Sequence, residues 1–206
     1  DTGLDLDHPS FAADPELNED SLTVADIEKV LPKLNASELY PAASAENLYR
    51  SAKVPFAFNY ENGTFDVGNL YAGSDHGTHV AGISAANPVE GSPVKGMAPD
   101  AQLVVMQVFQ STGGANWATI MAAMEDCIRL DVDAANLSLG AAAGFTDPDD
   151  AMLETMQRFM ESEVEVIIAS GWSGYTTWEL TDDGTLTFFP TEQTENGQTN
   201  LKNYWK

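Results

Sequence analysis

Apolar residues alternate between strand-like runs and helical spacing from about residue 76 onward. A mainly apolar run of strand length occupies 101–109, and 132–139 and 164–169 are also predicted to be strands. Small residues at helical spacing in 76–86 predict a helix, and two further helices are predicted over 116–130 and 147–162. The two later helices carry apolar faces at packing spacing, which indicate core rather than a cofactor site. These faces consist of Trp117, Ile120, Met121, Met124 and Ile128, and of Met152, Met156, Phe159 and Met160.

This alternation predicts an α/β fold, with a parallel sheet of buried strands and helices on both faces. Ligand sites in such sheets lie beyond the carboxyl ends of the strands. The segments to search for chemistry are therefore 1–3, the approach to His76, 138–140 and 170–174.

Two regions differ in character from this core. Residues 14–54 are interpreted as an insertion with two short helices, over 21–34 and 37–53, with breaks near Pro32 and Pro41. Residues 54–67 are predicted to be extended. We expect one domain over 1–174, incomplete in this chain, followed by a polar segment, 175–206, with a hairpin around Asp183 and Gly184.

Charge and composition exclude several classes of protein. The chain of 206 residues has a formal net charge of -23, so it repels nucleic-acid phosphates and anionic lipid headgroups. A single cysteine, Cys127, excludes an internal disulfide. No apolar run reaches the length of a membrane span. The chain opens on "DTGLDLDHPSF" without an initiator methionine, so we expect a piece of a longer protein.

The opening "DTG" places a carboxylate before a tight turn. The same three residues mark aspartic proteases, but those proteins are all-β and need two such aspartates sharing a proton. This chain has one "DTG" in α/β surroundings. The aspartic protease interpretation is therefore set aside.

The stretch "SDHGTHVAGI", residues 74–83, is more specific. Ser74 or Asp75 is suited to cap a helix that begins at His76, which places the imidazole at the helix mouth. His79 follows one turn later. A pair of core histidines is one alternative, and a zinc site at His76 and His79 is another. No third or fourth ligand has suitable spacing for zinc.

Two glycine-containing segments add to this pattern. Gly77 and Gly82 would let the histidine helix pack closely on the sheet. "NLSLG", residues 136–140, ends a strand whose free edge can bind an extended peptide by strand addition.

Taken in order, "DTG", "HGTHVAG", "NLSLG" and the turn "SGWSG" resemble the subtilisin-like serine proteases, whose chain order is aspartate, histidine, serine. "KVPFAFNY" and "KGMAPDAQLVVMQVF" further resemble the cell-envelope (lactocepin-like) branch of that family. The resemblance covers most of residues 1–174.

The resemblance implies a role for each matching residue. Asp1 matches the triad aspartate, His76 the general base, and His79 the second, non-catalytic histidine of the motif. In such a triad the imidazole takes the proton of the serine hydroxyl, and the carboxylate fixes the tautomer and stabilises the imidazolium. The strand that binds substrate through its backbone is matched by Ser138, Leu139 and Gly140.

This chain departs from the family pattern at two places. No G-T-S-x-A motif occurs before Lys206, so we expect the catalytic serine outside this chain, which alone would be inactive. Trp172 stands where the family has an asparagine that donates a hydrogen bond to the oxyanion. Indole has one N–H donor but is rigid and larger. A packing role for Trp172, or a different local alignment, is the alternative.

The sequence therefore predicts a piece of a secreted or cell-envelope serine endopeptidase that acts on extended polypeptide. The alternative is a non-catalytic, peptide-binding module of the same family, which Trp172 favours. Neither nucleic-acid nor membrane partners are expected of this segment. The chemistry requires no cofactor. Structural calcium is compatible with the family, but no set of six or more oxygen ligands can be assembled from the sequence.

Overall fold

The computed structural model describes residues 1–68, 75–90, 95–139, 151–168, 176–180, 186–190, 192–195 and 198–201. Two pairs of parallel strands form the sheet structure of its α/β core. β1 (Phe56–Asn59) pairs with β2 (Val104–Gln107), and β3 (Ala134–Leu137) pairs with β4 (Glu165–Ile168). Each predicted apolar run thus contains a strand in its interior. The α/β class with parallel strands is confirmed.

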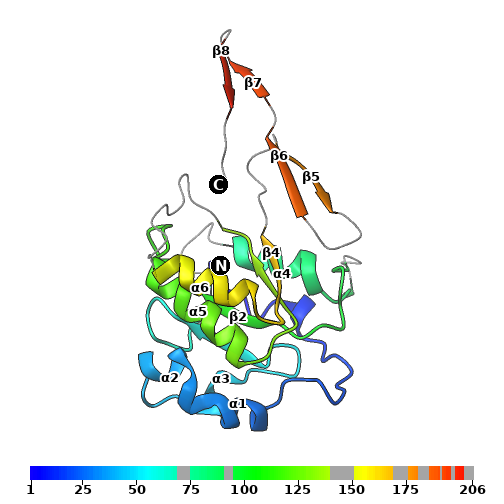
Figure 1. The fold of residues 1–206 in the computed structure, drawn as a ribbon. Coiled ribbons are helices and arrows are strands. Elements are labelled where there is room, and N and C mark those ends of the chain that lie inside the picture. The colour runs from blue at the N-terminus through cyan, green and yellow to red at the C-terminus, as the bar shows by residue number, and fades with distance from the viewer. Residues whose placement is uncertain are drawn as a thin grey trace.

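Three helices belong to this core. α4 (His76–Ala85), α5 (Trp117–Arg129) and α6 (Ala151–Met160) lie within the three segments where helices are predicted. The start of α5 is fixed by Asn116, whose side chain accepts a hydrogen bond from the Ala118 backbone N–H at 2.9 Å. α5 and α6 lie side by side (Figure 1).

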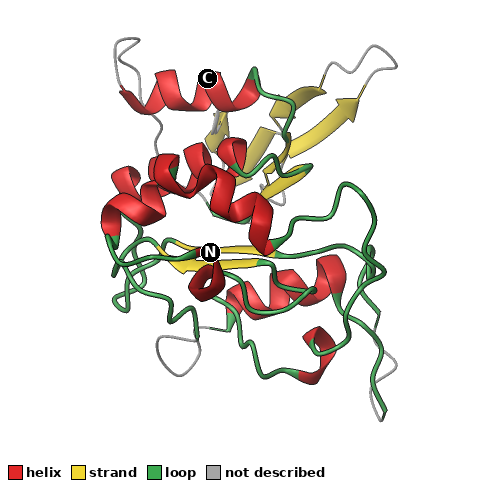
Figure 2. Cartoon of the chain, turned by 90° about the horizontal axis from the view of Figure 1, so that it is seen from below, coloured by secondary structure: helices red, strands yellow, loops and turns green. Residues whose placement is uncertain are grey.

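Strands β1 and β2 are covered on both faces, as Figure 2 shows. Because side chains alternate along a strand, Phe56 and Phe58 point to one face and Ala57 to the other. The phenylalanine face packs against α5 and against helices of the 14–54 insertion. The opposite face joins a smaller cluster with Leu4 and Ala81, so α4 covers that side. The large core therefore lies away from the histidine helix.

The insertion folds into short helices that pack on the core. They are α1 (Val24–Val30), the 3-10 turn η2 (Leu31–Lys33), α2 (Asn35–Leu39) and α3 (Ala45–Leu48), preceded by a 3-10 turn, η1 (Pro9–Phe11).

The break expected near Pro41 is present, but it separates two helices within the segment predicted as one, because α2 ends at Leu39 and α3 begins at Ala45. Pro41 disfavours helical backbone at the residue before it, and Tyr40 is extended at φ -134 and ψ 90.

The last described segments form two antiparallel hairpins. β5 (Thr176–Leu180) pairs with β6 (Leu186–Pro190), and β7 (Glu192–Glu195) pairs with β8 (Gln198–Leu201). The hairpin predicted around Asp183 and Gly184 is thus present in its strands, while its turn lies outside the described residues.

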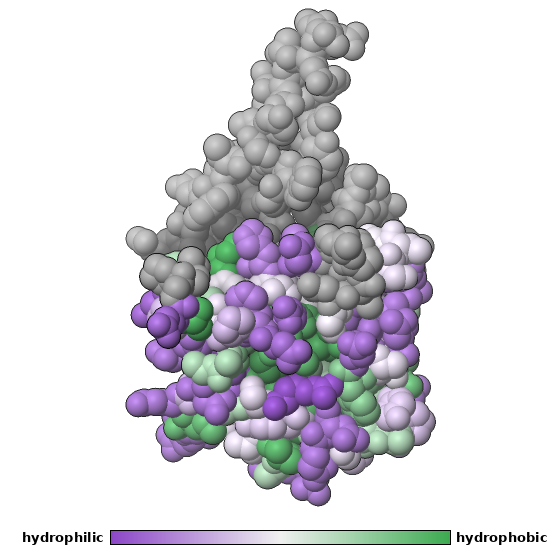
Figure 3. Space-filling view, turned by 180° about the vertical axis from the view of Figure 1, so that it is seen from behind, coloured by the Kyte–Doolittle hydropathy of each residue, from purple (hydrophilic) through white to green (hydrophobic). Residues whose placement is uncertain are grey.

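The surface of the described part is mixed in character. On the side seen in Figure 3 it is largely hydrophilic with smaller hydrophobic areas. Among the helices described, none combines the length and the apolar composition that crossing a bilayer requires.

Candidate active site

Asp1 lies along the edge of β2 that faces away from β1. Its backbone nitrogen donates to the Met106 carbonyl at 3.2 Å, and its carbonyl accepts from the Val108 N–H at 3.0 Å. These two bonds alternate as in a parallel ladder. They place the Asp1 side chain beyond the carboxyl end of β2, which is where ligand sites of parallel sheets occur.

Helix α4 begins at His76, as the sequence predicts. Asp75 occupies the N-cap position, but its side chain makes no capping hydrogen bond. The expected cap comes from elsewhere, because the Gly77 N–H donates to Thr2 Oγ1 at 2.9 Å. The helix start is therefore held by the "DTG" turn, 75 residues away in sequence. The other predicted cap, Ser74, lies outside the described residues.

The structure brings Asp1 and His76 into direct contact. His76 Nδ1 lies 2.9 Å from Asp1 Oδ1 and 3.1 Å from Oδ2. The Thr2 N–H also donates to Asp1 Oδ1, at 2.6 Å, which fixes the carboxylate against its own turn. The His76 side chain is 50% exposed and the Asp1 side chain 20% exposed. With Nδ1 turned to the carboxylate, Nε2 is the ring nitrogen left for a reacting group.

Two glycines make this contact sterically feasible. A Cβ on Gly77 would lie 2.1 Å from the Gly3 carbonyl oxygen and 3.1 Å from Asp1 Oδ1. Gly3 has φ +107, and a Cβ there would lie 2.2 Å from the Val67 carbonyl oxygen. A larger residue at Gly77 would therefore push the helix away from the turn, and one at Gly3 would push the turn away from Val67. The predicted close-packing role of Gly82 is wrong for the described part, where a Cβ at that position would meet nothing within 4 Å.

Two threonines that sequence reasoning missed also join the motifs. Thr2 Oγ1 accepts from Gly77, and Thr78 Oγ1 accepts from the Asp5 N–H at 2.8 Å. Each motif thus supplies a hydroxyl to the backbone of the other. The sequence could have indicated these threonines by their position, since Thr2 directly follows Asp1 and Thr78 lies two residues after His76.

The remaining predicted site residues are not all placed. Ser138 and Leu139 follow β3, with the Ser138 hydroxyl donating to Asn136 Oδ1 at 3.1 Å. Gly140 and Trp172 lie outside the described residues, so their roles stay predictions. His79 is exposed on α4. Within the part of the chain that the structure describes, no three His, Cys, Asp or Glu side chains converge to hold a metal ion.

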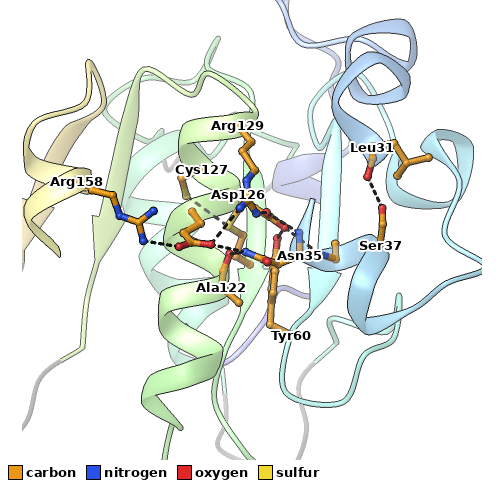
Figure 4. A network of polar contacts seen from close by, with 12 residues as sticks. Leu31, Asn35, Ser37, Tyr60, Ala122, Asp126, Cys127, Arg129 and Arg158 are labelled. Carbon is orange, nitrogen blue, oxygen red and sulfur yellow. Dashed lines mark hydrogen bonds and ion pairs between the residues drawn. The ribbon is translucent and has the colours of Figure 1, made fainter. Parts of the chain in front are cut away.

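A second carboxylate network lies in the interior between α5 and the insertion (Figure 4). Asp126 is fully buried and accepts from the N–H groups of Asn35 at 2.8 Å and Ala36 at 2.9 Å. It also accepts from the Tyr60 hydroxyl at 2.9 Å and from Arg129 Nη1 at 2.8 Å. Burial, and then the Asp126 charge, raise the pKa of Tyr60 well above its ordinary value, so the phenol remains a donor.

An aspartate bonded to Nδ1 of a half-exposed histidine, at the end of a parallel sheet, is an arrangement that suits general acid–base chemistry. The model of the Subtilase family matches residues 1–196. The chain belongs to this family.

Curated relatives agree with this assignment. The chain is 32% identical over 183 residues to a PII-type proteinase of Lactococcus lactis subsp. cremoris, covering 84% of this chain and 9% of that protein. It is 35% identical over 112 residues to the minor extracellular protease Vpr of Bacillus subtilis, covering 54% of this chain and 13% of that protein. It is 38% identical over 103 residues to subtilisin E of Bacillus subtilis, covering 50% of this chain and 26% of that protein. The resemblance to the cell-envelope proteinases is confirmed.

Proposed function

We propose that this chain is part of a subtilisin-like serine endopeptidase that hydrolyses peptide bonds in extended polypeptides. The observation that carries the proposal is the bond from His76 Nδ1 to Asp1, at 2.9 Å, in a chain of the Subtilase family. The relatives' names support it, because they are proteinases and extracellular proteases. By the same likeness, the protein acts outside the cell or at the cell envelope.

The roles of the pair follow from its geometry. Asp1 holds the imidazole with its proton on Nδ1, so the lone pair of Nε2 is available as a base. His76 takes the proton of the attacking serine hydroxyl and later gives it to the leaving amine. Asp1 stabilises the imidazolium that exists between these two steps. The serine is expected beyond Lys206, where a G-T-S-x-A motif would place it.

The substrate would bind as an added strand beside residues 138–140. A peptide in this position donates to and accepts from the backbone, so it is recognised largely independently of its side chains. Ser138 and Leu139 directly follow β3 and are partly exposed. The proposed substrate class is therefore extended polypeptide.

The test is hydrolysis of an unfolded protein substrate by the intact gene product. His76→Ala is expected to abolish measurable turnover, because no other group takes the serine proton. His79→Ala is the matched control: an exposed histidine three residues along the same helix, for which we expect unchanged turnover. Equal activity of wild type and His76→Ala would overturn the proposal.

Trp172 decides how strong this activity is. The family's asparagine donates to the oxyanion, and loss of such a donor slows the chemical step by about 100- to 1,000-fold. We expect Trp172→Asn to raise kcat at least tenfold in the intact protein, a gain smaller than the full effect of such a donor. The same assay measures it. An unchanged kcat would show that Trp172 does not occupy the oxyanion position.

A further inference from the structure

The Asp1–His76 contact joins two segments that lie far apart in the sequence. Asp1 belongs to a turn held at the edge of β2, and His76 is the first residue of α4. Half of the His76 side chain is exposed to solvent, so packing alone does not fix the ring. Polar contacts near the pair therefore add to the packing of Leu4 with Ala81 in setting the relative position of turn and helix.

Two hydroxyl groups make reciprocal bonds across this junction. Thr2 Oγ1 accepts from the Gly77 N–H at 2.9 Å, and Thr78 Oγ1 accepts from the Asp5 N–H at 2.8 Å. Gly77 and Thr78 are the two residues after His76, while Thr2 and Asp5 lie just after Asp1. Both bonds are partly buried, where a lost partner leaves an N–H group poorly solvated.

We propose that Thr2 and Thr78 are positioning residues that hold the start of α4 against the "DTG" turn and so set the Asp1–His76 geometry. This inference rests on the proposed peptidase function for its kinetic consequence. The glycine contacts explain why the ties matter, because Gly77 allows close approach of the helix to the Gly3 carbonyl but supplies no attraction. The Thr2 and Thr78 hydroxyl groups supply the attraction, because each accepts a directional hydrogen bond from the backbone of the other segment. Thr2 also acts through its own N–H, which donates to Asp1 Oδ1 at 2.6 Å and is present in any variant of its side chain.

The kinetic experiment uses the intact protein and the isosteric variants Thr2→Val and Thr78→Val. A misplaced general base lowers kcat without weakening substrate binding, and displacements of this kind cost up to about 100-fold. We expect kcat to fall about 10- to 100-fold in each variant, with KM unchanged, and Thr2→Ser to restore it. The matched control is Thr119→Val, which removes a partly buried hydroxyl that bonds Glu61 instead.

A second readout does not depend on peptidase activity. Diethyl pyrocarbonate modifies exposed imidazole nitrogens, and mass spectrometry of peptides resolves His76 from His79. With Nδ1 held at Asp1, His76 takes one carbethoxyl group, at Nε2. Thr2→Val and Thr78→Val are expected to add a second group at His76, as far as Asp1→Ala does, while His79 stays unchanged. Single modification of His76 in both variants, with unaltered kcat, would overturn the inference.

The two readouts separate this inference from the proposed function. If the wild type hydrolyses no polypeptide, the peptidase proposal fails and the labelling pattern still decides the role of the threonines. If Thr2→Val does not fold, as judged by circular dichroism, Thr78→Val tests the other tie. A kcat loss that Thr2→Ser does not restore would assign the effect to side-chain volume and would contradict the hydroxyl role.

Discussion

Asp1 and Asp126 are both aspartates that bond groups far away in sequence, yet they serve different purposes. Asp126 is fully buried and is bonded by four donors, including two N–H groups at the start of α2. Asp1 is bonded by one backbone N–H and by an imidazole that is 50% exposed. The buried carboxylate has all its partners inside the protein and acts as a structural tie. The other holds a partner that solvent and substrate can reach.

The exposure of the partner therefore separates a chemical role from a structural one. A carboxylate surrounded by fixed donors in a dry interior cannot pass on a change in protonation without breaking the fold. A carboxylate bonded to a half-exposed histidine can stabilise a charge that appears on that ring during a reaction. Loss of Asp126 should consequently affect stability, and loss of Asp1 should affect turnover.

The largest expected effect belongs to Asp1. Asp1→Asn keeps the shape of the side chain but offers an amide to His76 Nδ1, which favours the wrong tautomer. We expect kcat of the intact protein to fall by about four orders of magnitude, with little change in the free energy of unfolding. Steady-state hydrolysis and urea unfolding measure the two quantities. Asp7→Asn, at an exposed position in the same segment, is the control. A large loss of stability in Asp1→Asn would break the comparison.

The next effect is that of Asp126 on stability. Asp126→Ala leaves the Asn35 and Ala36 N–H groups, the Tyr60 hydroxyl and Arg129 without their carboxylate. Removing one partner of a buried ion pair costs about 3–5 kcal/mol. We expect urea unfolding to show a loss of this size.

Glu163→Ala, at an exposed carboxylate, is the matched control for Asp126→Ala. If the two variants lose equal stability, water replaces the carboxylate and the structural role of Asp126 is wrong. An intact kcat per folded molecule in Asp126→Ala would separate the two aspartates further.

The two networks differ in how far sequence predicts them. "DTG" and "HGTHVAG" are short motifs, and the glycines and threonines that join them lie within two residues of Asp1 or of His76. Their mutual contact follows from strand ends meeting at one edge of a parallel sheet. Asp126 has no such signal, because it lies on a helix whose apolar pattern indicates only a packed face. Its partner α2 belongs to the 14–54 insertion, and the spacing of apolar residues does not indicate where that insertion packs on the core.

The same limit explains the errors in the fold. Strands β2, β3 and β4 and helices α4 and α5 lie within the segments where the sequence pattern predicts them. The break near Pro41 is predicted from the sequence, but the start of α2 at Asn35, before the predicted segment 37–53, is not. The cap of α4 depends on Thr2, which no local rule connects to Gly77. At this helix start a partner distant in the sequence, Thr2, takes the place of the neighbouring Asp75 side chain that a capping motif predicts.

A smaller effect concerns Cys127, which neighbours Asp126 on α5. Burial, and then the Asp126 charge, raise the pKa of the Cys127 thiol to about 12. At mildly alkaline pH the residue is almost entirely thiol, so iodoacetamide should alkylate it far more slowly than a free cysteine. Mass spectrometry of the alkylated protein measures the rate. We expect Asp126→Ala to speed the reaction, because the interior then opens to solvent. Rapid alkylation of the wild type would show that the Asp126 region is not closed.

The smallest effect belongs to a third carboxylate, Asp26, whose side chain is 39% exposed. It accepts from Lys29 Nζ at 2.7 Å and from the Thr23 hydroxyl at 2.5 Å, at the start of α1. Lys29, and then Thr23, lower the pKa of Asp26 from 3.8 to about 2.

A lowered carboxyl pKa stabilises the folded state above the ordinary value, and this contribution is lost as pH falls from 3.8 through about 2. Because the pair is exposed, water and salt screen it, and we expect less than about 1 kcal/mol. Urea unfolding of wild type and Asp26→Asn should therefore differ slightly at neutral pH and converge in strong acid. An equal difference at both pH values would assign the effect to helix capping alone. Asp1, Asp26 and Asp126 therefore differ most in their partners, which are a half-exposed imidazole for Asp1, a lysine and a threonine at a helix start for Asp26, and four interior donors for Asp126.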